Sequence, residues 1–537
     1  MHTKQQIYNI INSGRKKQLK MKRIEIMDTT LRDGEQTTGV SFNESEKLAM
    51  AQMLLDEIRV NRIEVASARV SEGEFMSVKK ITEWAAAKNF LDRVEVLAFV
   101  DGTLSLDWTV EAGAKVINLL TKGSLKHCEG QLRKTPEEHF LDIENVIKEA
   151  EKRGISVNVY LEDWSNGMIH SPDYVFQMID YLKNLNIKRI MLPDTLGILN
   201  PDQTFEFCSA VINRYPGVHF DFHAHNDYDL ATANVMASVK AGVHGLHTTV
   251  NGLGERAGNV PLASVMGVLN DHLHIENTLA ESKLSKVSKM VELFSGLRIP
   301  ANKPLTGEFV FTQCCGVHAD GDHKGDLYFN ELLPERFGRM RRYALGKTSG
   351  KASIKKNLEE LGITLSKEDI DKVTQRVIEL GDKKETVTTE DLPYIISDVL
   401  KNHISEQNIR LVNYHLSIAK GMKPVASIRI CIGEQVYSET SAGDGQYDAF
   451  MKALWKIYSG LKKSRPVLTD YKVTIPPGGK TDALVETTIT WDYEGMEYTT
   501  RGLDADQTEA AIKATMKMLN IISNQELKKR PKAVNIE

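Results

Sequence analysis

The chain has few cysteines, and none of them form a CxxC pair. It has five, an odd number, and they stand mostly far apart: Cys128, Cys208, Cys314, Cys315 and Cys431. Small secreted domains that depend on disulfides instead carry an even number of cysteines in a compact framework. We therefore expect a reduced, cytoplasmic protein without structural disulfides.

Long apolar runs and an excess of one charge are also missing. No apolar stretch approaches the roughly 20 residues that span a bilayer. The basic N-terminus lacks the apolar core and the cleavage site of a signal peptide. The 68 Lys and Arg residues nearly balance the 72 Asp and Glu residues, for a formal net charge of −4. This balance argues against a nucleic-acid-binding face or a polybasic membrane anchor, so we expect neither partner.

A glycine-rich nucleotide turn is absent as well, because "LRDGEQ" stands after the first predicted strand. What the sequence does contain is a series of short β-rich apolar runs that alternate with helical segments between Ile24 and Gly252. This alternation favours a (β/α)8 TIM barrel over a doubly wound open sheet. The eight runs are "IEIMD", "RIEVA", "RVEVLAFV", "VINLL", "VNVYLED", "RIMLPDT", "HFDFHAH" and "GLHTTVNG".

A chain of 537 residues is too long for a single core, and its character changes after the barrel. The stretch "PLTGEFVFTQCCGVHADGDHKGDLY" predicts an ordered functional loop, and helical periodicity follows it. From Ile409 onward, strands followed by a helix occur twice, which predicts an α+β domain with an internal ββ(β)α repeat. The predicted parts are an N-terminal arm (1–21), the barrel (22–297), a linker region (298–404), the α+β domain (405–525) and a tail (526–537).

Polar residues gather where the predicted strands end, which is where such barrels carry their active sites. In "HFDFHAH", His223 and His225 are two residues apart and point to the same side of a strand. Asp33 follows the first strand, in "DTTLRDGEQ". Two imidazoles and a carboxylate that converge in this way predict a divalent-metal site. The loop "NGLGERAGN" either contacts an anionic group of a ligand or is a structural turn.

Taken together, "DTTLRDGEQ", "HAHND" and "NGLGERAGN" resemble the signatures of the Claisen-condensing acyltransferases, the family of isopropylmalate, homocitrate and citramalate synthases. The resemblance extends from about Ile24 to Leu519 and includes the C-terminal repeat, which is similar to the family's amino-acid-sensing regulatory domain. Three further stretches, "LLTKGSLKHCEGQLRKTPEEHF", "VNVYLEDWSNG" and "TIPPGGKTDALVET", look most like the bacterial (R)-citramalate synthases of the pyruvate route to isoleucine.

The resemblance implies a metal-dependent condensation of acetyl-CoA with pyruvate to (R)-citramalate and CoA. Mn²⁺, Mg²⁺ or Zn²⁺ would be held by Asp33, His223 and His225, with Asn259 as a weak or indirect ligand. Arg32 would support the growing alkoxide, and Thr195 would bind the substrate carboxylate. The candidate bases are Glu162 and His318. The second would be polarised by Asp320, would act with Tyr328, and would reach the active site of the partner subunit in a homodimer.

Selection of the oxo acid depends on the size of the pocket. Isopropylmalate synthases tend to have a small Ser two residues before the catalytic Glu, and this chain has Tyr160 there. Tyr160, Leu97 and Leu120 are therefore expected to line a pocket that admits pyruvate and excludes 2-oxoisovalerate. Alternatively, Tyr160 only packs at the barrel mouth, and the chain is a 2-isopropylmalate synthase. A lyase or a pyruvate carboxyltransferase of the same superfamily lacks support, and a catalytically silent amino-acid sensor is disfavoured by the intact site.

The C-terminal repeat is expected to bind the end product of the pathway and inhibit the enzyme. Isoleucine is the predicted effector for a citramalate synthase, and leucine for an isopropylmalate synthase. The alternative is that the apolar positions concerned form only the core of the domain. The predicted effector residues are Tyr447, Leu468, Tyr471, Ile475, Thr481, Val485 and Gln507.

Overall fold

A computed structural model describes residues 23–275, 277–361, 363–382, 387–400, 408–475 and 485–529. The chain divides into two compact units: Met1–Thr312 with Phe329–Arg342, and Gln313–Tyr328 with Tyr343–Glu537. The predicted N-terminal arm (1–21) lies outside the described residues, as does the predicted tail from residue 530 on. Within the described residues, no helix combines the length and apolar character that crossing a membrane demands.

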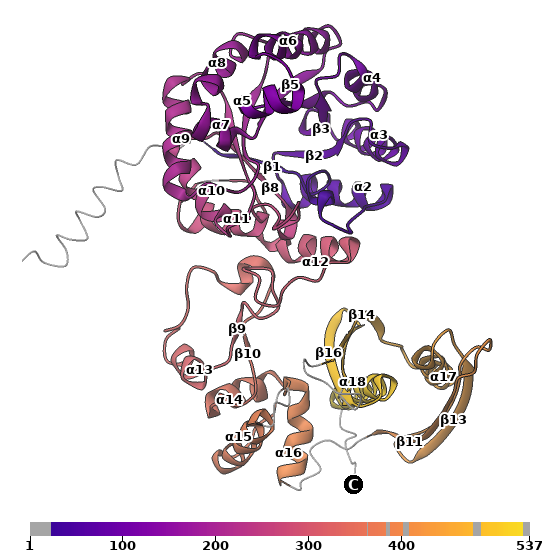
Figure 1. Cartoon of the computed structure of the whole chain (residues 1–537). Helices are drawn as coiled ribbons and strands as arrows, with labels where there is room; N and C mark the ends of the chain where they lie inside the picture. The colour runs from indigo at the N-terminus through magenta and orange to yellow at the C-terminus, as the bar shows by residue number, and fades with distance from the viewer. Residues whose placement is uncertain are drawn as a thin grey trace, which may run out of the picture. The chain divides into compact units, whose positions relative to one another are not determined.

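The first unit contains a closed barrel of eight parallel strands in sequence order, which confirms the predicted fold (Figure 1). Strand β1 pairs with β2 on one side and closes the barrel against β8 on the other, with Asp28 opposite Thr248. The strands are β1 Glu25–Asp28, β2 Arg62–Ser67, β3 Val94–Phe99, β4 Val116–Lys122, β5 Ser156–Glu162, β6 Arg189–Asp194, β7 Phe220–Ala224 and β8 Gly245–Thr248.

Helices surround the barrel, and capping residues in the sequence set where several of them begin. Thr135 and Glu138 form a capping box at the start of α6, and Asn200 with Gln203 does the same for α9. Each box fixes the length of the loop that precedes its helix. The helices are α2 Glu44–Gln52, α3 Glu72–Ala87, α4 Leu104–Glu111, α5 Leu125–His127, α6 Pro136–Lys152, α7 Trp164–His170, α8 Pro172–Leu182, α9 Pro201–Arg214, α10 Ala231–Ala241, α11 Leu262–Asp271 and α12 Leu284–Ser295.

The second unit begins with a group of short helices. The stretch that we predicted to be a loop contains helix α13 (Gly316–His323), and that part of the prediction was wrong. Helices α14 (Lys351–Glu360), α15 (Lys367–Asp382) and α16 (Leu392–Leu400) follow. They share a small apolar core that includes Ile354, Leu358, Val373 and Ile396.

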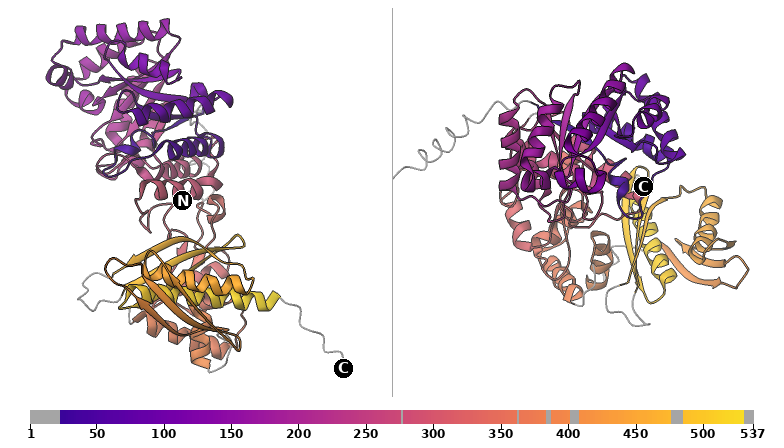
Figure 2. Two further views of the ribbon diagram at one scale, coloured as in Figure 1. Left: turned by 90° about the vertical axis from the view of Figure 1, so that its right-hand side faces the viewer. Right: turned by 45° about the horizontal axis from the view of Figure 1, so that its top comes forward.

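The rest of the second unit has two βββα repeats, as the sequence predicted. Each antiparallel sheet has three strands in sequence order, and the helix that follows packs on its own sheet (Figure 2). Strand β15 alternates buried and half-buried side chains, as expected when one face of a sheet is covered. The elements are β11 Ile409–Ser417, β12 Val425–Ile432, β13 Gln435–Ala442 and α17 Gln446–Gly460, then β14 Val467–Thr474, β15 Val485–Tyr493, β16 Met496–Asp504 and α18 Gln507–Lys529.

Candidate active site

Asp33, His223 and His225 lie together at the carboxyl ends of the barrel strands. One possible donor atom from each lies within 4.8 Å of the others, and all three side chains are buried. Asp33 Oδ2 is 3.2 Å from His223 Nε2, and the two imidazole rings are 5.0 Å apart. The alternation in β7 therefore turns both imidazoles inward, toward the carboxylate that follows β1.

The electrostatics of this cluster favour the protonation states that bind a cation. Burial raises the pKa of the Asp33 carboxyl, but Arg32 and the two histidines together lower it by more than burial raises it. The carboxyl group therefore stays ionised. Burial, reinforced by His223 nearby, lowers the pKa of His225 to about 4. A neutral imidazole and an ionised carboxylate are the forms that ligate divalent metals.

Two unsatisfied polar atoms beside the cluster show that the residues suit a metal ion. His225 Nδ1 and Asn259 Oδ1 are buried and lack a hydrogen-bond partner among the described residues. The backbones of His225 and Asn259 pair in an isolated bridge, which brings the amide to the histidine. Buried polar groups are normally satisfied, so the orphaned atoms indicate that a ligand belongs here. The nitrogen and oxygen donor set fits Mn²⁺ and Zn²⁺, and Mg²⁺ less well.

Arg32 is held beside the cluster by a carboxylate that the sequence reasoning missed. Glu64 in β2 is fully buried, and its Oε2 accepts a hydrogen bond from Arg32 Nε at 2.6 Å. Asn118 Nδ2 donates to the other oxygen of Glu64 at 2.8 Å. Because Glu64 engages the Nε edge, the terminal nitrogens of Arg32 are directed away from it.

Glu162 forms an ion pair with Lys122, another residue that the sequence reasoning missed. The two residues end β5 and β4 and lie opposite each other in the register. The backbone N–H of Lys122 donates to His139 Nε2 on α6 at 3.1 Å, which fixes this strand end. A lysine at the end of "VINLLTK" could have signalled the pair, since that place in a barrel faces the active site.

Thr195 and the "NGLGERAGN" loop form the rim above β6 and β8. Thr195 Oγ1 accepts a hydrogen bond from the backbone N–H of Asp163 at 2.9 Å, and its carbonyl oxygen accepts one from Arg256 Nη2 at 2.8 Å. Gly258 has φ of +83°, and a Cβ there would lie 1.9 Å from the carbonyl oxygen of Gly252. The loop therefore has a structural need for glycine, whatever it also binds.

The predicted pocket residues form a small apolar cluster inside the barrel, separate from the main core. Leu97 and Tyr160 are buried together with Met27 and Met191, and Leu120 packs against them half-buried. The Tyr160 hydroxyl lies 3.0 Å from His247 Nδ1 on β8. The cluster lies next to the metal-ligand candidates, since the Tyr160 ring is 6.1 Å from that of His223.

His318, Asp320 and Tyr328 belong to the second unit. The ring centroids of His318 and Tyr328 are 4.1 Å apart with the rings tilted by 33°, so the structure brings these two together. Asp320 has a different partner in this structure from the expected His318. Asp320 pairs with Lys324 at 2.6 Å, while His318 Nδ1 lies 3.2 Å from Gln313 Oε1. Residues two apart on a helix such as α13 point to different faces, and we had expected a loop here.

The structure brings together part of the predicted effector residues. The rings of Tyr447 and Tyr471, from different repeats, are 5.6 Å apart, and Gln507 hydrogen-bonds Tyr471. Val485 is buried, whereas Leu468 and Ile475 are 40% and 61% exposed. Thr481 lies outside the described residues.

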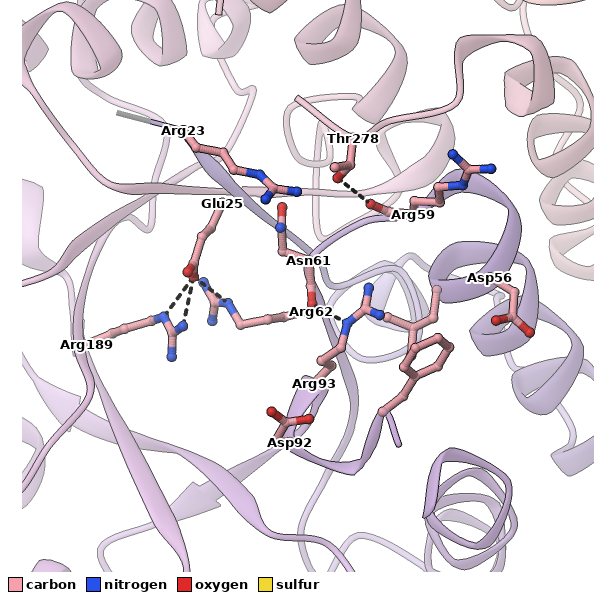
Figure 3. A pocket seen from close by; sticks show the side chains of 12 residues that line it. Arg23, Glu25, Asp56, Arg59, Asn61, Arg62, Asp92, Arg93, Arg189 and Thr278 are labelled. Carbon is pink, nitrogen blue, oxygen red and sulfur yellow. Dashed lines mark hydrogen bonds and ion pairs between the residues drawn. The ribbon is translucent and has the colours of Figure 1, made fainter. Parts of the chain in front are cut away.

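A buried ionic network connects the site with the opposite end of the barrel. His247 Nε2 lies 3.2 Å from Asp221 Oδ2, and Arg62 contacts both Asp221 (2.5 Å) and Glu95 (2.9 Å). Arg62 also lies 3.3 Å from Glu25, which pairs with Arg189 as well (Figure 3). Glu25, Arg62 and Arg189 line an arginine-rich cavity of about 570 Å³ at the amino ends of the strands. Isolated polar residues within apolar strands, as in "RIEVA" and "HFDFHAH", were the available signal for this network.

Comparisons with known proteins agree with this architecture. Residues 23–291 match the HMGL-like family model, 305–385 the homocitrate synthase post-HMGL domain-like model, and 386–523 the LeuA allosteric (dimerisation) domain. An (R)-citramalate synthase of Methanocaldococcus jannaschii is 32% identical, over 93% of this chain and 100% of its own length. A 2-isopropylmalate synthase of the same organism is 31% identical, over 93% of this chain and 95% of its own.

Proposed function

Because the chain belongs to the family of 2-oxo-acid acyltransferases that holds the (R)-citramalate and 2-isopropylmalate synthases, we propose that it condenses acetyl-CoA with pyruvate. The products are (R)-citramalate and CoA, in the first step of the pyruvate route to isoleucine. The observation that carries the choice of pyruvate is the apolar cluster beside the metal-ligand candidates. Tyr160 occupies space there that a branched oxo acid would need, with Leu97 and Leu120 against it.

The metal-ligand candidates and the polar residues beside them have complementary roles in this reaction. Asp33, His223 and His225, beside Asn259, would hold a divalent cation, which would supply Lewis acidity toward the carbonyl group of the oxo acid. Arg32, fixed by Glu64, provides positive charge where the carbonyl oxygen becomes negative. Thr195 Oγ1 accepts from a backbone N–H, so its own proton is available to the substrate carboxylate.

The new bond joins the methyl carbon of acetyl-CoA to the keto carbon of pyruvate. Glu162 is our first candidate for the base that removes the methyl proton, because its carboxylate ends β5 at the face of the barrel that carries the metal-ligand candidates, where Lys122 holds it. His318, whose ring lies against that of Tyr328, is the second candidate. Water then cleaves the thioester, and CoA leaves as the free thiol. This hydrolysis makes the overall condensation irreversible.

A second candidate function is 2-isopropylmalate synthesis, since a relative of that name is similar at nearly the same identity. Steady-state release of CoA thiol, measured with pyruvate, 2-oxobutyrate and 2-oxoisovalerate in turn, distinguishes the two. We expect the highest kcat/KM with pyruvate. A higher kcat/KM with 2-oxoisovalerate would establish the alternative and refute the pocket argument.

We further propose that the C-terminal repeats bind isoleucine in a homodimer and inhibit the enzyme. The match to a LeuA allosteric domain supports this proposal, as do the paired tyrosines at the two repeats. Lys517 on α18 pairs with Asp391, directly before α16, and so connects the repeats to the helices that would transmit the signal.

Titration calorimetry of the full-length protein tests the effector. Isoleucine should bind and leucine should bind more weakly, and Tyr471→Ala should abolish binding because it removes half of the aromatic pair. Tyr437→Ala is the control, since Tyr437 is a half-buried tyrosine of β13 whose hydroxyl donates to Gln435 and which is not one of the predicted effector residues. Absence of both binding heat and inhibition at millimolar isoleucine would refute the regulatory proposal.

A further inference from the structure

We propose that His247 is a positioning residue for oxo-acid selection, because it anchors the hydroxyl of Tyr160 and thereby fixes the ring that limits the pocket. His247 lies in β8, on the far side of the barrel interior from β5, and it is 1% exposed. Its Nδ1 is 3.0 Å from the Tyr160 hydroxyl. The inference rests on the proposed function for the identity of the oxo acid, but the contact itself does not.

Asp221 determines which nitrogen of His247 accepts the hydrogen bond from the Tyr160 hydroxyl. The carboxylate of Asp221 lies 3.2 Å from His247 Nε2 and is paired with the buried Arg62 at 2.5 Å. A carboxylate held ionised by an arginine can only accept a hydrogen bond, so Nε2 carries the imidazole proton. Nδ1 then presents a lone pair, and the Tyr160 hydroxyl donates to it.

The hydroxyl anchor is the directional restraint on the Tyr160 ring. The ring meets the His247 and His223 rings edge-on, at 84° and 88°, and Arg32 lies 5.9 Å from its centroid. The apolar side chains of the cluster also pack against the ring, and these non-directional contacts tolerate small shifts of it. A buried hydroxyl that loses its acceptor must find another, so the ring would tilt and change the shape of the pocket.

His223 competes for the same acceptor. Its Nδ1 lies 3.3 Å from His247 Nδ1, farther than the Tyr160 hydroxyl. One lone pair serves one donor well, and the shorter contact assigns it to the tyrosine. The opposite assignment would make His247 a support for a metal ligand, with an effect on metal affinity in place of substrate choice.

A matched pair of substitutions separates the two nitrogens. His247→Asn keeps a polar atom near the Nδ1 position and loses the reach to Asp221, whereas His247→Gln keeps the reach to Asp221 and removes the acceptor for Tyr160. Tyr160→Phe removes the hydroxyl from the other side and leaves the ring. The measured quantity is the ratio of kcat/KM for pyruvate to kcat/KM for 2-oxoisovalerate, with the full-length enzyme in saturating Mn²⁺.

We expect the ratio to fall by about tenfold in Tyr160→Phe and in His247→Gln, which is the scale at which pocket shape discriminates small substrates. In the variant that carries both changes, the ratio should fall no further than in either single variant, because both substitutions break the same contact. His247→Asn should stay within about threefold of the original ratio. Any of three results would overturn the proposal. The ratio could be unchanged in His247→Gln, the two single changes in the ratio could add in the double variant, or the ratio could fall equally in His247→Asn and His247→Gln.

Mn²⁺ affinity, measured by calorimetry on the same variants, provides the second readout. It should be alike in His247→Gln and the unaltered protein. A loss of Mn²⁺ affinity with an unchanged substrate ratio would assign His247 to the metal ligand and overturn the proposal. The unaltered enzyme alone tests the proposed function: if it prefers 2-oxoisovalerate, that function fails, while the change in ratio among the variants still decides the role of His247.

Discussion

Lowering the pH should decrease the free energy of unfolding of the barrel through protonation of His139, by an amount that follows from the environment of this residue. His139 is 1% exposed on α6, and its Nε2 accepts the backbone N–H of Lys122 at the end of β4. Burial, reinforced by the charge of Lys134, lowers its pKa from the ordinary 6.5 to about 4. Protonation in the folded state would place a charge in an apolar site and turn the accepting nitrogen into a donor that faces another donor.

The sign and size of the effect follow from proton linkage. Between pH 6.5 and 4 the unfolded chain binds the proton and the folded chain does not, so the free energy of unfolding falls as the pH falls through this window. From pH 7.5 to pH 5.0, two pKa values of 6.5 and about 4 give a loss of about 2 kcal/mol from this one histidine. A folded-state pKa anywhere below about 4.5 changes this loss little, because the proton is then absent from the folded state at pH 5.

His139→Gln is the matched perturbation, since its side-chain oxygen can accept the same N–H but does not titrate. Urea unfolding at pH 7.5 and 5.0, with chelator present, would be followed by hydrogen exchange of peptides from β4 and α6, which report on the barrel alone. We expect the unaltered protein to lose about 2 kcal/mol more than the variant between the two pH values. Other buried histidines contribute equally to both proteins and cancel. An equal loss of unfolding free energy in the unaltered protein and in His139→Gln would refute the reasoning, because His139 would then titrate alike in the folded and unfolded chains.

Two further predictions concern the interior of the barrel. Arg62→Met should lower the free energy of unfolding by about 3–5 kcal/mol in urea, because it removes the arginine that the buried carboxylates of Glu95 and Asp221 share. Arg189→Met removes a half-exposed ion pair and should lower the free energy of unfolding by about 1 kcal/mol or less. An equal decrease in the two variants would contradict the conclusion that Arg62 stabilises the barrel interior. His225→Ala should abolish Mn²⁺ binding in calorimetry and leave the circular dichroism spectrum unchanged, whereas the exposed control His272→Ala should bind normally. Retained binding in His225→Ala would remove this residue from the ligand set.

Much of the architecture was predictable because it depends on short-range patterns. The eight apolar runs and the glycine-punctuated helices between them specified the barrel, and the repeated strand-then-helix order specified the two C-terminal repeats. The ligand candidates could also be predicted, because the alternation of a strand places His223 and His225 on one side without any knowledge of the fold. The segment around His318 was harder, since its glycine and aspartate content concealed a short helix, and the helix directs Asp320 away from the histidine.

Patterns in the amino-acid sequence were enough to predict the fold class, the end of the barrel where the candidate site lies, and the three metal-ligand candidates. The partners that side chains find across strands became known from the three-dimensional structure alone: Glu64 with Arg32, Lys122 with Glu162, and His247 with Tyr160. The physical reason is the range of each interaction. Periodicity within a strand fixes the direction of a side chain locally, whereas a partner across the barrel depends on the stagger of strands that are distant in sequence.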